Sequence, residues 1–404
     1  MSAEQQDRLT RVGPGTPMGQ LLRCYWHPIA ASVEIAPGSA KEVRLLGEDL
    51  ALFRQPDGRL GLVARQCSHR GASLAYGLAS NQGIACPYHG WVFDSKGACR
   101  AIPSEPDRPA LRERAAITAY PVEELGGLVF AYLGQAPAPL LPRYDLYVWD
   151  NCLRDIGRAD LPCNWLQIME NSVDPVHVEY LHGHHLAAQR GESNGYGRRH
   201  AKIGFDLFER GIIKRRVLEG GSESDDDWRV GHPLVFPLTL RVGAQGQHRF
   251  QVRVPVDDET TQHYWYACYL PPEGARAPAQ AEVPLYEVPW RNEDGSFRTD
   301  FVDGGDIMAW ITQGAIADRT VEMLVGSDRG IVILRRLLEE QMALVEAGSD
   351  PMGVIRNPLE NVEIRFEQET DKLGGHSDFL RRAMEISHAR FSPIRKQVLA
   401  MLDE

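Results

Sequence analysis

Two short stretches of the chain each combine one cysteine with one histidine: Cys67-x-His69 and, after sixteen intervening residues, Cys86-x-x-His89. A structural zinc site usually draws on cysteine pairs and histidine pairs, whereas a Rieske [2Fe–2S] cluster binds two cysteines at one iron and two histidines at the other. The mixed pairs therefore favour a Rieske cluster over zinc or four unrelated core residues. A glycine follows each pair, at positions 71 and 90, and allows the backbone to turn beneath a metal.

A second stretch with metal-binding potential is Asp174-Pro-Val-His177-Val-Glu-Tyr-Leu-His182. Its two histidines are five residues apart, slightly more than one helical turn, so a local bulge or a helix end is needed to aim both rings at one point. Two imidazoles and one carboxylate form the facial triad of non-haem Fe(II) oxygenases, although zinc uses the same ligand types. We predict a mononuclear metal site at His177 and His182. A packed or exposed histidine pair is the alternative, and His184 and His185 stand close by.

Length and composition are those of a globular protein with two or three domains: 404 residues, 43% hydrophobic and 25% charged. A formal net charge of −11 disfavours nucleic-acid binding. No run approaches eighteen apolar residues and the N-terminus has no apolar signal core, so we expect neither a membrane span nor secretion. The cysteines other than Cys67 and Cys86 are scattered and odd in number, which predicts free thiols in a reducing cytoplasm.

The cysteine–histidine pairs lie among short predicted strands. Apolar residues alternate between residues 43 and 64, interrupted by a hairpin turn in which Pro56 presets φ and Gly58 takes a positive φ. The proline-rich stretch 135–142 marks a domain boundary. We therefore expect an all-β Rieske domain at residues 26–136 and a catalytic domain at 137–404, onto which residues 1–25 pack.

The strand and helix patterns of the catalytic domain predict an α+β fold, in which helices cover an antiparallel sheet. Strand patterns occupy residues 201–218 and 229–270, and loops are expected at 183–200 and 271–304. Apolar periodicity and start signals predict four helices, at residues 162–170, 306–325, 330–347 and 378–402.

The combined pattern resembles the α subunits of Rieske non-haem iron aromatic-ring-hydroxylating oxygenases, with Glu170-Asn171-x-x-Asp174 preceding the two histidines. Three further stretches are similar to the phthalate-dioxygenase-like branch, which includes phenoxybenzoate dioxygenases and aryl ether O-demethylases: Thr10-Arg-Val-Gly-Pro-Gly, Tyr25-Trp-His-Pro and Val254-Pro-Val-Asp-Asp. The resemblance implies two cofactors, a [2Fe–2S] Rieske cluster and a mononuclear Fe(II), and catalytic-site roles for Asn171 and Asp174.

The third iron ligand must come from elsewhere in the chain. Gln313-Gly-Ala-Ile-Ala-Asp318 resembles the segment in which this branch supplies its carboxylate, so we expect Asp318 to complete the site with His177 and His182. Asp318 as a solvated helix-face charge, or paired with Arg319, is the alternative. Glu322, one helical turn further on, is the rival ligand.

The resemblance also implies how the subunits assemble. In this family the cluster and the iron of one chain are too far apart for electron transfer, and an aspartate at the position of Asp174 joins iron ligand His177 to a Rieske histidine of the neighbouring subunit, here His89. We therefore expect a head-to-tail homotrimer without a small β subunit. A carboxylate three residues before His177 can orient its ring; the alternative is that Asp174 only caps the turn before Pro175.

The expected function is the terminal oxygenase of a Rieske system, which uses O₂ to hydroxylate a small aromatic substrate, an aromatic carboxylate by analogy with branch relatives. Oxidative O-demethylation fits the same site, and a Rieske electron carrier or a scaffold that has lost its metals are the remaining alternatives. No Gly-x-Gly-x-x-Gly fingerprint follows a strand, so a separate NAD(P)H-dependent reductase, with or without a ferredoxin, must supply electrons. Four arginines on predicted strands are candidates for binding the carboxylate: Arg215, Arg216, Arg241 and Arg253.

Overall fold

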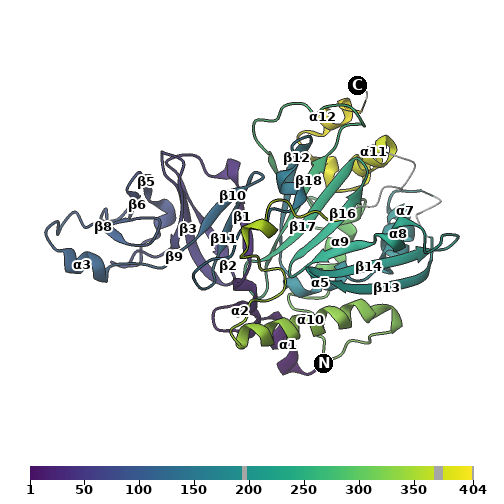
Figure 1. The fold of residues 1–404 in the computed structure, drawn as a ribbon, viewed down its shortest axis with the longest axis horizontal. Coiled ribbons are helices and arrows are strands. Elements are labelled where there is room, and N and C mark those ends of the chain that lie inside the picture. The colour runs from purple at the N-terminus through teal and green to yellow at the C-terminus, as the bar shows by residue number, and fades with distance from the viewer. Residues whose placement is uncertain (193–197, 368–375, 403–404) are drawn as a thin grey trace.

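The protein is described here by a computed structural model that covers residues 1–192, 198–367 and 376–402. It divides into two parts along its longest axis (Figure 1). Three small sheets form one part, and a large sheet with most of the helices forms the other. This arrangement confirms the predicted α+β class, a small all-β part followed by a sheet covered by helices.

The small part contains three antiparallel sheets. The first contains β1 (Trp26–Ala31), β11 (Leu128–Tyr132) and β10 (Val122–Leu125). The second contains β2 (Ala40–Leu45), β3 (Glu48–Arg54), β4 (Leu60–Ala64) and β9 (Ala119–Tyr120). The third contains β5 (Leu78–Ser80), β6 (Gly83–Ala85), β7 (Val92–Phe93) and β8 (Cys99–Ala101), and α3 (Pro109–Arg114) lies beyond it at the tip.

The turn between β3 and β4 has the predicted hairpin geometry. Arg54 pairs with Leu60 across the hairpin, and the Gln55 N–H donates to the carbonyl oxygen of Arg59 at 2.8 Å. Gly58 has a φ of +92°, a conformation that glycine adopts without steric cost. The sequence signal is therefore confirmed, and the strand it starts leads directly to Cys67.

The large sheet has eight strands in the order β13-β14-β15-β16-β17-β18-β12-β19. Neighbouring strands are antiparallel except at one edge, where the short β19 pairs in parallel with β12. Its strands are β12 (Leu153–Leu161), β13 (His200–Phe208), β14 (Gly211–Leu218), β15 (His232–Val235), β16 (Thr239–Ala244), β17 (Gln247–Pro255), β18 (Thr261–Tyr269) and β19 (Leu285–Glu287).

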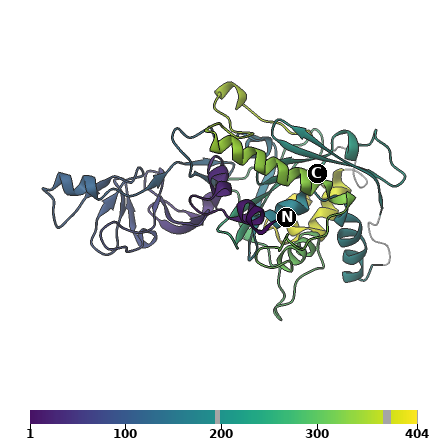
Figure 2. The ribbon, with the colours of Figure 1, turned by 90° about the horizontal axis from the view of Figure 1, so that it is seen from below.

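Helices from both ends of the chain cover this sheet. Figure 2 shows the long α10 (Arg329–Glu346) beside the N-terminal helices α1 (Ala3–Thr10) and α2 (Pro17–Arg23), with which it makes contact. None of the helices in the described ranges is long and apolar enough to cross a membrane. The other α-helices are α4 (Asp145–Val148), α5 (Trp165–Ser172), α6 (His177–Glu179), α7 (Leu186–Gln189), α8 (Asp226–Arg229), α9 (Val302–Ile311), α11 (His376–Ile386) and α12 (Arg395–Ala400).

Three predicted segments differ in the structure. The helix expected at 306–325 begins earlier, as α9, and ends before Gly314, whose φ of +96° does not continue a helix. The helix expected at 378–402 is interrupted at Ser387, whose hydroxyl caps the short turn η6 (His388–Phe391). Residues 183–189, expected as loop, are helical, and residues 193–197 of that predicted loop lie outside the described residues.

Candidate metal and redox sites

The two cysteine–histidine loops have the same backbone pattern. The amide N–H of each cysteine donates to the carbonyl oxygen five residues ahead, Ala72 at 2.9 Å and Trp91 at 2.8 Å, and each following glycine N–H donates back to its cysteine carbonyl oxygen. Gly71 and Gly90 have φ values of +74° and +72°, so each loop closes through a left-handed glycine. The loops connect β4 to β5 and β6 to β7, which places both at the tip of the small part.

The loops bury their thiols and expose their imidazoles. Cys67 and Cys86 are 3% and 4% exposed, whereas His69 and His89 are exposed, with ring centroids 4.6 Å apart. Burial raises the pKa of Cys67 to about 11, although the amides of His69 and Arg70 stabilise its thiolate. Two buried sulfurs with two exposed imidazoles above them fit a [2Fe–2S] cluster of Rieske type, whose histidine-bound iron faces the surface.

The second site brings His177 and His182 together with Asp306 of α9. Asp306 Oδ1 lies 3.2 Å from His182 Nε2 and 3.8 Å from His177 Nε2, and one potential ligand atom of each residue lies within 4.8 Å of the others. The two rings are 5.0 Å apart at their centroids and nearly perpendicular. This is the two-histidine, one-carboxylate set that non-haem Fe(II) sites use.

A π-helical turn explains how histidines five residues apart face one point. His177 lies in α6, and the chain then widens into η3 (Tyr180–His185), a π-helical turn that contains His182. One additional residue per turn brings position i+5 onto the face that i+4 occupies in an α-helix. The local bulge expected from the spacing is therefore present.

The chemistry of the triad fits a cation. Asp306 is 7% exposed, and its buried Oδ1 has no hydrogen-bond partner among the described residues. A buried carboxylate oxygen without a donor is costly, and a divalent cation between it and the two imidazole nitrogens removes that cost. His177, His182 and Asp306 are therefore the residues that would hold a mononuclear metal.

The structure brings Asp306, and not the expected Asp318, together with the two histidines. The Asp318 carboxylate is exposed, and its Oδ1 accepts hydrogen bonds from the Thr320 N–H at 2.9 Å and the Thr320 hydroxyl at 2.6 Å. The rival Glu322 pairs with Arg335 instead. The signal that could have identified α9 is its two carboxylates, Asp303 and Asp306, among apolar residues and glycines, since a buried carboxylate needs a partner.

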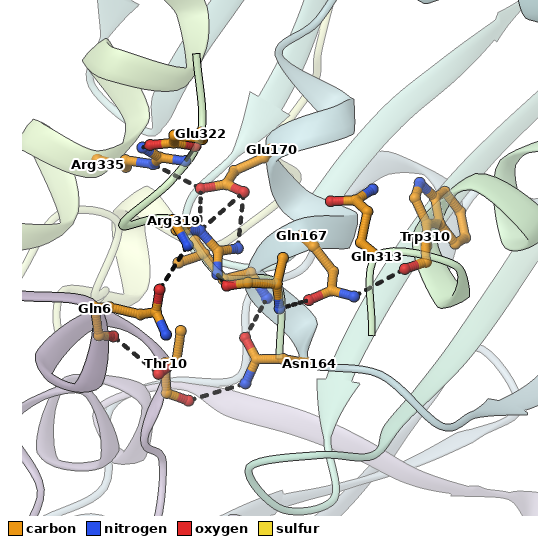
Figure 3. A network of polar contacts seen from close by, with 12 residues as sticks. Gln6, Thr10, Asn164, Gln167, Glu170, Trp310, Gln313, Arg319, Glu322 and Arg335 are labelled. Atoms are coloured by element: carbon orange, nitrogen blue, oxygen red, sulfur yellow. Dashed lines mark hydrogen bonds and ion pairs between the residues drawn. The ribbon is translucent and has the colours of Figure 1, made fainter. Parts of the chain in front are cut away.

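Figure 3 shows the polar contacts that hold residues 313–322 against α5. Gln167 of α5 donates to the Trp310 carbonyl oxygen at 2.8 Å and accepts from the Ala317 N–H at 2.9 Å. Arg319, 2% exposed, donates to both carboxylate oxygens of Glu170, which also accepts from Arg335 at 2.7 Å. The segment therefore docks against α5, next to α1.

Glu170→Gln should destabilise the fold, because it removes the negative charge and one of the two carboxylate acceptors that face the buried Arg319. Uncompensated buried charge costs about 3–5 kcal/mol. Urea denaturation should show a loss of that size in the free energy of unfolding. The matched control is Glu340→Gln, since its partner Arg336 is exposed on α10, and it should cost less than about 0.5 kcal/mol. Equal effects of the two substitutions would contradict the structural role of Glu170.

Asp174 lies beside the metal triad and makes two contacts. Its Oδ1 accepts from the Val176 N–H at 2.8 Å, which caps the following turn, and its Oδ2 lies 3.4 Å from His177 Nδ1. Burial alone would raise the pKa of Asp174, but His177 and the Val176 amide hold it below its ordinary value. An ionised Asp174 can therefore orient the ring of the metal ligand His177 while it also caps the turn, so the two roles are compatible.

The triad opens into a cavity of about 200 Å³ with a basic lining. Asn171 lines it, together with Lys214, Arg216 and Arg249. Of the four arginines proposed from the sequence, Arg216 lines this cavity and Arg215 pairs with Asp206. Arg241 and Arg253 are buried and do not line it. The sequence analysis did not identify Lys214 and Arg249. Arg249 lies two residues before Gln251 on β17, so both side chains are on the same face of the strand, and both line the cavity.

Arg249 makes few hydrogen bonds with the described residues. One Nη lies 3.3 Å from His388 Nδ1, and its buried Nε has no hydrogen-bond acceptor among the described residues. Arg216, by contrast, pairs with Asp227 at 2.7 Å. A guanidinium with an unused donor in a cavity wall is suited to bind a carboxylate.

The chain is similar to known proteins over most of its length. A model of the Rieske [2Fe-2S] domain family matches residues 25–121. The chain is 41% identical to the 5,5'-dehydrodivanillate O-demethylase oxygenase subunit of Sphingobium sp. (strain NBRC 103272 / SYK-6), over 90% of this chain and 86% of the relative. It is 36% identical to the phenoxybenzoate dioxygenase subunit alpha of Ectopseudomonas oleovorans, over 86% of this chain and 87% of the relative.

A solved structure has the same fold. The terminal oxygenase of carbazole 1,9a-dioxygenase from Novosphingobium sp. KA1 superposes with a TM-score of 0.62 at 23% identity, over 84% of this chain and 98% of the other. The small sheets, the large sheet and the helices that cover it are therefore a known combination.

Proposed function

Because the chain belongs to the α subunits of the Rieske non-haem iron aromatic-ring-hydroxylating oxygenases, we propose that it is a terminal oxygenase that acts on a small aromatic carboxylate. The observation that supports this substrate class is the cavity at the metal triad, whose lining includes three basic side chains, Lys214, Arg216 and Arg249. Inside a partly buried cavity a charge-assisted hydrogen bond to a carboxylate is strong and directional.

The residues that would hold the two cofactors lie in separate parts of the chain. Cys67, Cys86, His69 and His89 would hold the Rieske cluster, and the triad would hold Fe(II). When bound, these groups supply one-electron transfer and O₂ activation, respectively. A separate NAD(P)H-dependent reductase, with or without a ferredoxin, is the electron source in this proposal. The protein itself binds the substrate, orients its ring toward the triad and keeps the cavity closed to bulk water.

Oxidative O-demethylation is the second candidate outcome, and one observation favours it. The relative with 41% identity is an O-demethylase oxygenase subunit, whereas the relative with 36% identity is a dioxygenase subunit. Hydroxylation of a methyl ether carbon gives a hemiacetal that releases formaldehyde, so the same site serves both reactions. The products distinguish them: formaldehyde plus a phenol for O-demethylation, a hydroxylated ring for the other.

The protein with its reductase and NADH should oxidise benzoates, phthalates or methoxylated benzoates. The kcat/KM for the corresponding methyl esters should be at least about tenfold lower, because the ester loses a charged hydrogen bond worth about 1.5–3 kcal/mol. Arg249→Gln should remove most of this difference. Arg336→Gln, on the exposed face of α10, is the matched control and should leave it unchanged. Equal turnover of acids and esters by the unaltered protein would contradict the proposed substrate class.

We also propose that the working unit is a head-to-tail homotrimer. Within one chain the Cys/His loops lie at one end of the longest axis, whereas α7, which directly follows η3, lies in the other part (Figure 1). Large exposed side chains stand beside both sites: Tyr76, Leu78 and Tyr88 near the loops, and Tyr180 in η3. Such groups are typical of interfaces. In this arrangement the partner subunit's His89 would approach Asp174, and Asp174 would connect the partner's Rieske cluster to the metal triad.

A further inference from the structure

A fully buried arginine lies next to the wall of the cavity at the metal triad. Arg253 of β17 is 0% exposed, and among the described residues its guanidinium donates to Gln251 alone. One Nη donates to the Gln251 carbonyl oxygen at 2.9 Å and the other to Gln251 Oε1 at 2.7 Å, while the buried Nε has no acceptor in the same part of the chain. Burial lowers the pKa of Arg253 to about 9, although Asp306 raises it, so the side chain stays protonated at neutral pH.

This contact is a poor way to stabilise a buried charge. A carboxylate at position 251 would pair with the guanidinium, whereas the amide of Gln251 gives it one neutral acceptor. Gln251 is 7% exposed and lines the cavity together with the three residues of the metal triad. The amide therefore has a second environment besides Arg253, and that environment is the cavity.

Arg253 fixes the direction in which the Gln251 amide faces. An arginine only donates hydrogen bonds, so the amide atom in contact with it must be the oxygen. The NH₂ group is then on the other side of the amide, and it donates to none of the described residues. A free glutamine can turn its amide to offer either an acceptor or a donor, but Gln251 offers the cavity two N–H donors.

We infer that Gln251 is a specificity-determining residue, which donates a hydrogen bond to an oxygen atom on the ring of the substrate, and that Arg253 is the positioning residue that orients it. This inference rests on the proposed function. An ether oxygen accepts a hydrogen bond and cannot donate one, so it complements the fixed NH₂ group. An alkyl group of the same shape leaves that donor unpaired in a partly buried site, which lowers affinity.

Calorimetric titration of the metal-loaded protein without O₂ tests the inference with two acids of the same shape, methoxybenzoate and ethylbenzoate, each as its 3- and 4-isomers. The two acids differ only in an oxygen atom that replaces a CH₂ group. We expect the methoxy acid to bind about fivefold more tightly for at least one isomer, equivalent to about 1 kcal/mol.

Gln251→Glu separates recognition from stability, because it keeps an acceptor oxygen for Arg253 and removes the donor. The preference for the methoxy acid should fall below about twofold, while the urea midpoint of unfolding does not decrease. The added charge acts on both acids alike, so it does not change their ratio. A purely structural role of Gln251 would leave the preference unchanged in this variant.

Gln341→Glu is the matched control. Gln341 of α10 is also 7% exposed, its Oε1 accepts from the Met352 N–H at 2.7 Å, and it does not line the cavity, so the preference should stay about fivefold. Arg253→Met leaves the Gln251 amide free to turn and should likewise reduce the preference below about twofold, whereas Arg253→Lys keeps a donor beside Oε1 and should retain it.

Binding of both acids with equal affinity by the unaltered protein, or a preference that Gln251→Glu retains, would overturn this inference and leave the proposed function standing. Absence of binding by both acids would overturn the proposed substrate class, and the role of Gln251 with it.

Discussion

Asp306→Ala should reduce the iron of the mononuclear site from about one per chain to a small fraction and lower turnover by about a hundred-fold or more. Asp306 supplies the only carboxylate oxygen that the described residues place with the His177 and His182 nitrogens, and two neutral imidazoles alone hold Fe(II) weakly. Even loss of a residue that merely orients a ligand costs about 10–100-fold in metal affinity. Iron analysis after gel filtration, with turnover measured in parallel, checks this result.

The Rieske spectrum of Asp306→Ala should remain unchanged, because its cysteine and histidine ligands lie in the small part of the molecule. Asp318→Ala is the matched control: it removes an exposed aspartate whose Oδ1 contacts only Thr320, so iron and turnover should match the unaltered protein. The opposite result, loss of iron in Asp318→Ala with normal iron in Asp306→Ala, would return the third ligand to Asp318.

Asp174→Asn should keep both metals and the trimer yet reduce turnover by about a hundred-fold or more. The carboxylate makes two contacts: its Oδ1 accepts from the Val176 N–H, and its Oδ2 faces His177. An ionised aspartate only accepts hydrogen bonds, whereas asparagine has one acceptor oxygen and one donor nitrogen. If the amide oxygen accepts from the Val176 N–H, the NH₂ group faces the imidazole N–H of His177. Neither the His177 ring nor the partner's His89 then has an acceptor at this position.

Single-turnover measurements separate this effect from a structural one. The reduced Rieske cluster should lose its electron to the oxygenation step much more slowly in Asp174→Asn, while iron content and molar mass by light scattering stay those of the unaltered protein. Asp318→Asn, the same chemical change at an exposed site, should behave as the unaltered protein. Normal coupled turnover in Asp174→Asn, or a fully active monomer, would contradict the proposed bridge.

The sequence alone determined the sites whose ligands lie close together in the chain. Cys67 and His69, like Cys86 and His89, fall within single tight loops, where spacing and the following glycine restrict the geometry. The same holds for His177 and His182, because five residues leave few ways to bring two rings together, and a π-helical turn is one of them. Strand alternation likewise predicted the small sheets and most strands of the large sheet.

Only the tertiary structure decided which distant carboxylate reaches the two histidines. Asp306 and Asp318 are twelve residues apart, and both looked compatible with one long helix. Gly314 ends that helix, and the buried pairing of Arg319 with Glu170 draws the following segment to another side of α5. Such long-range contacts depend on packing between elements, which local periodicity does not encode. For the same reason the basic lining of the cavity at the metal triad appears only when the sheet and its helices are assembled.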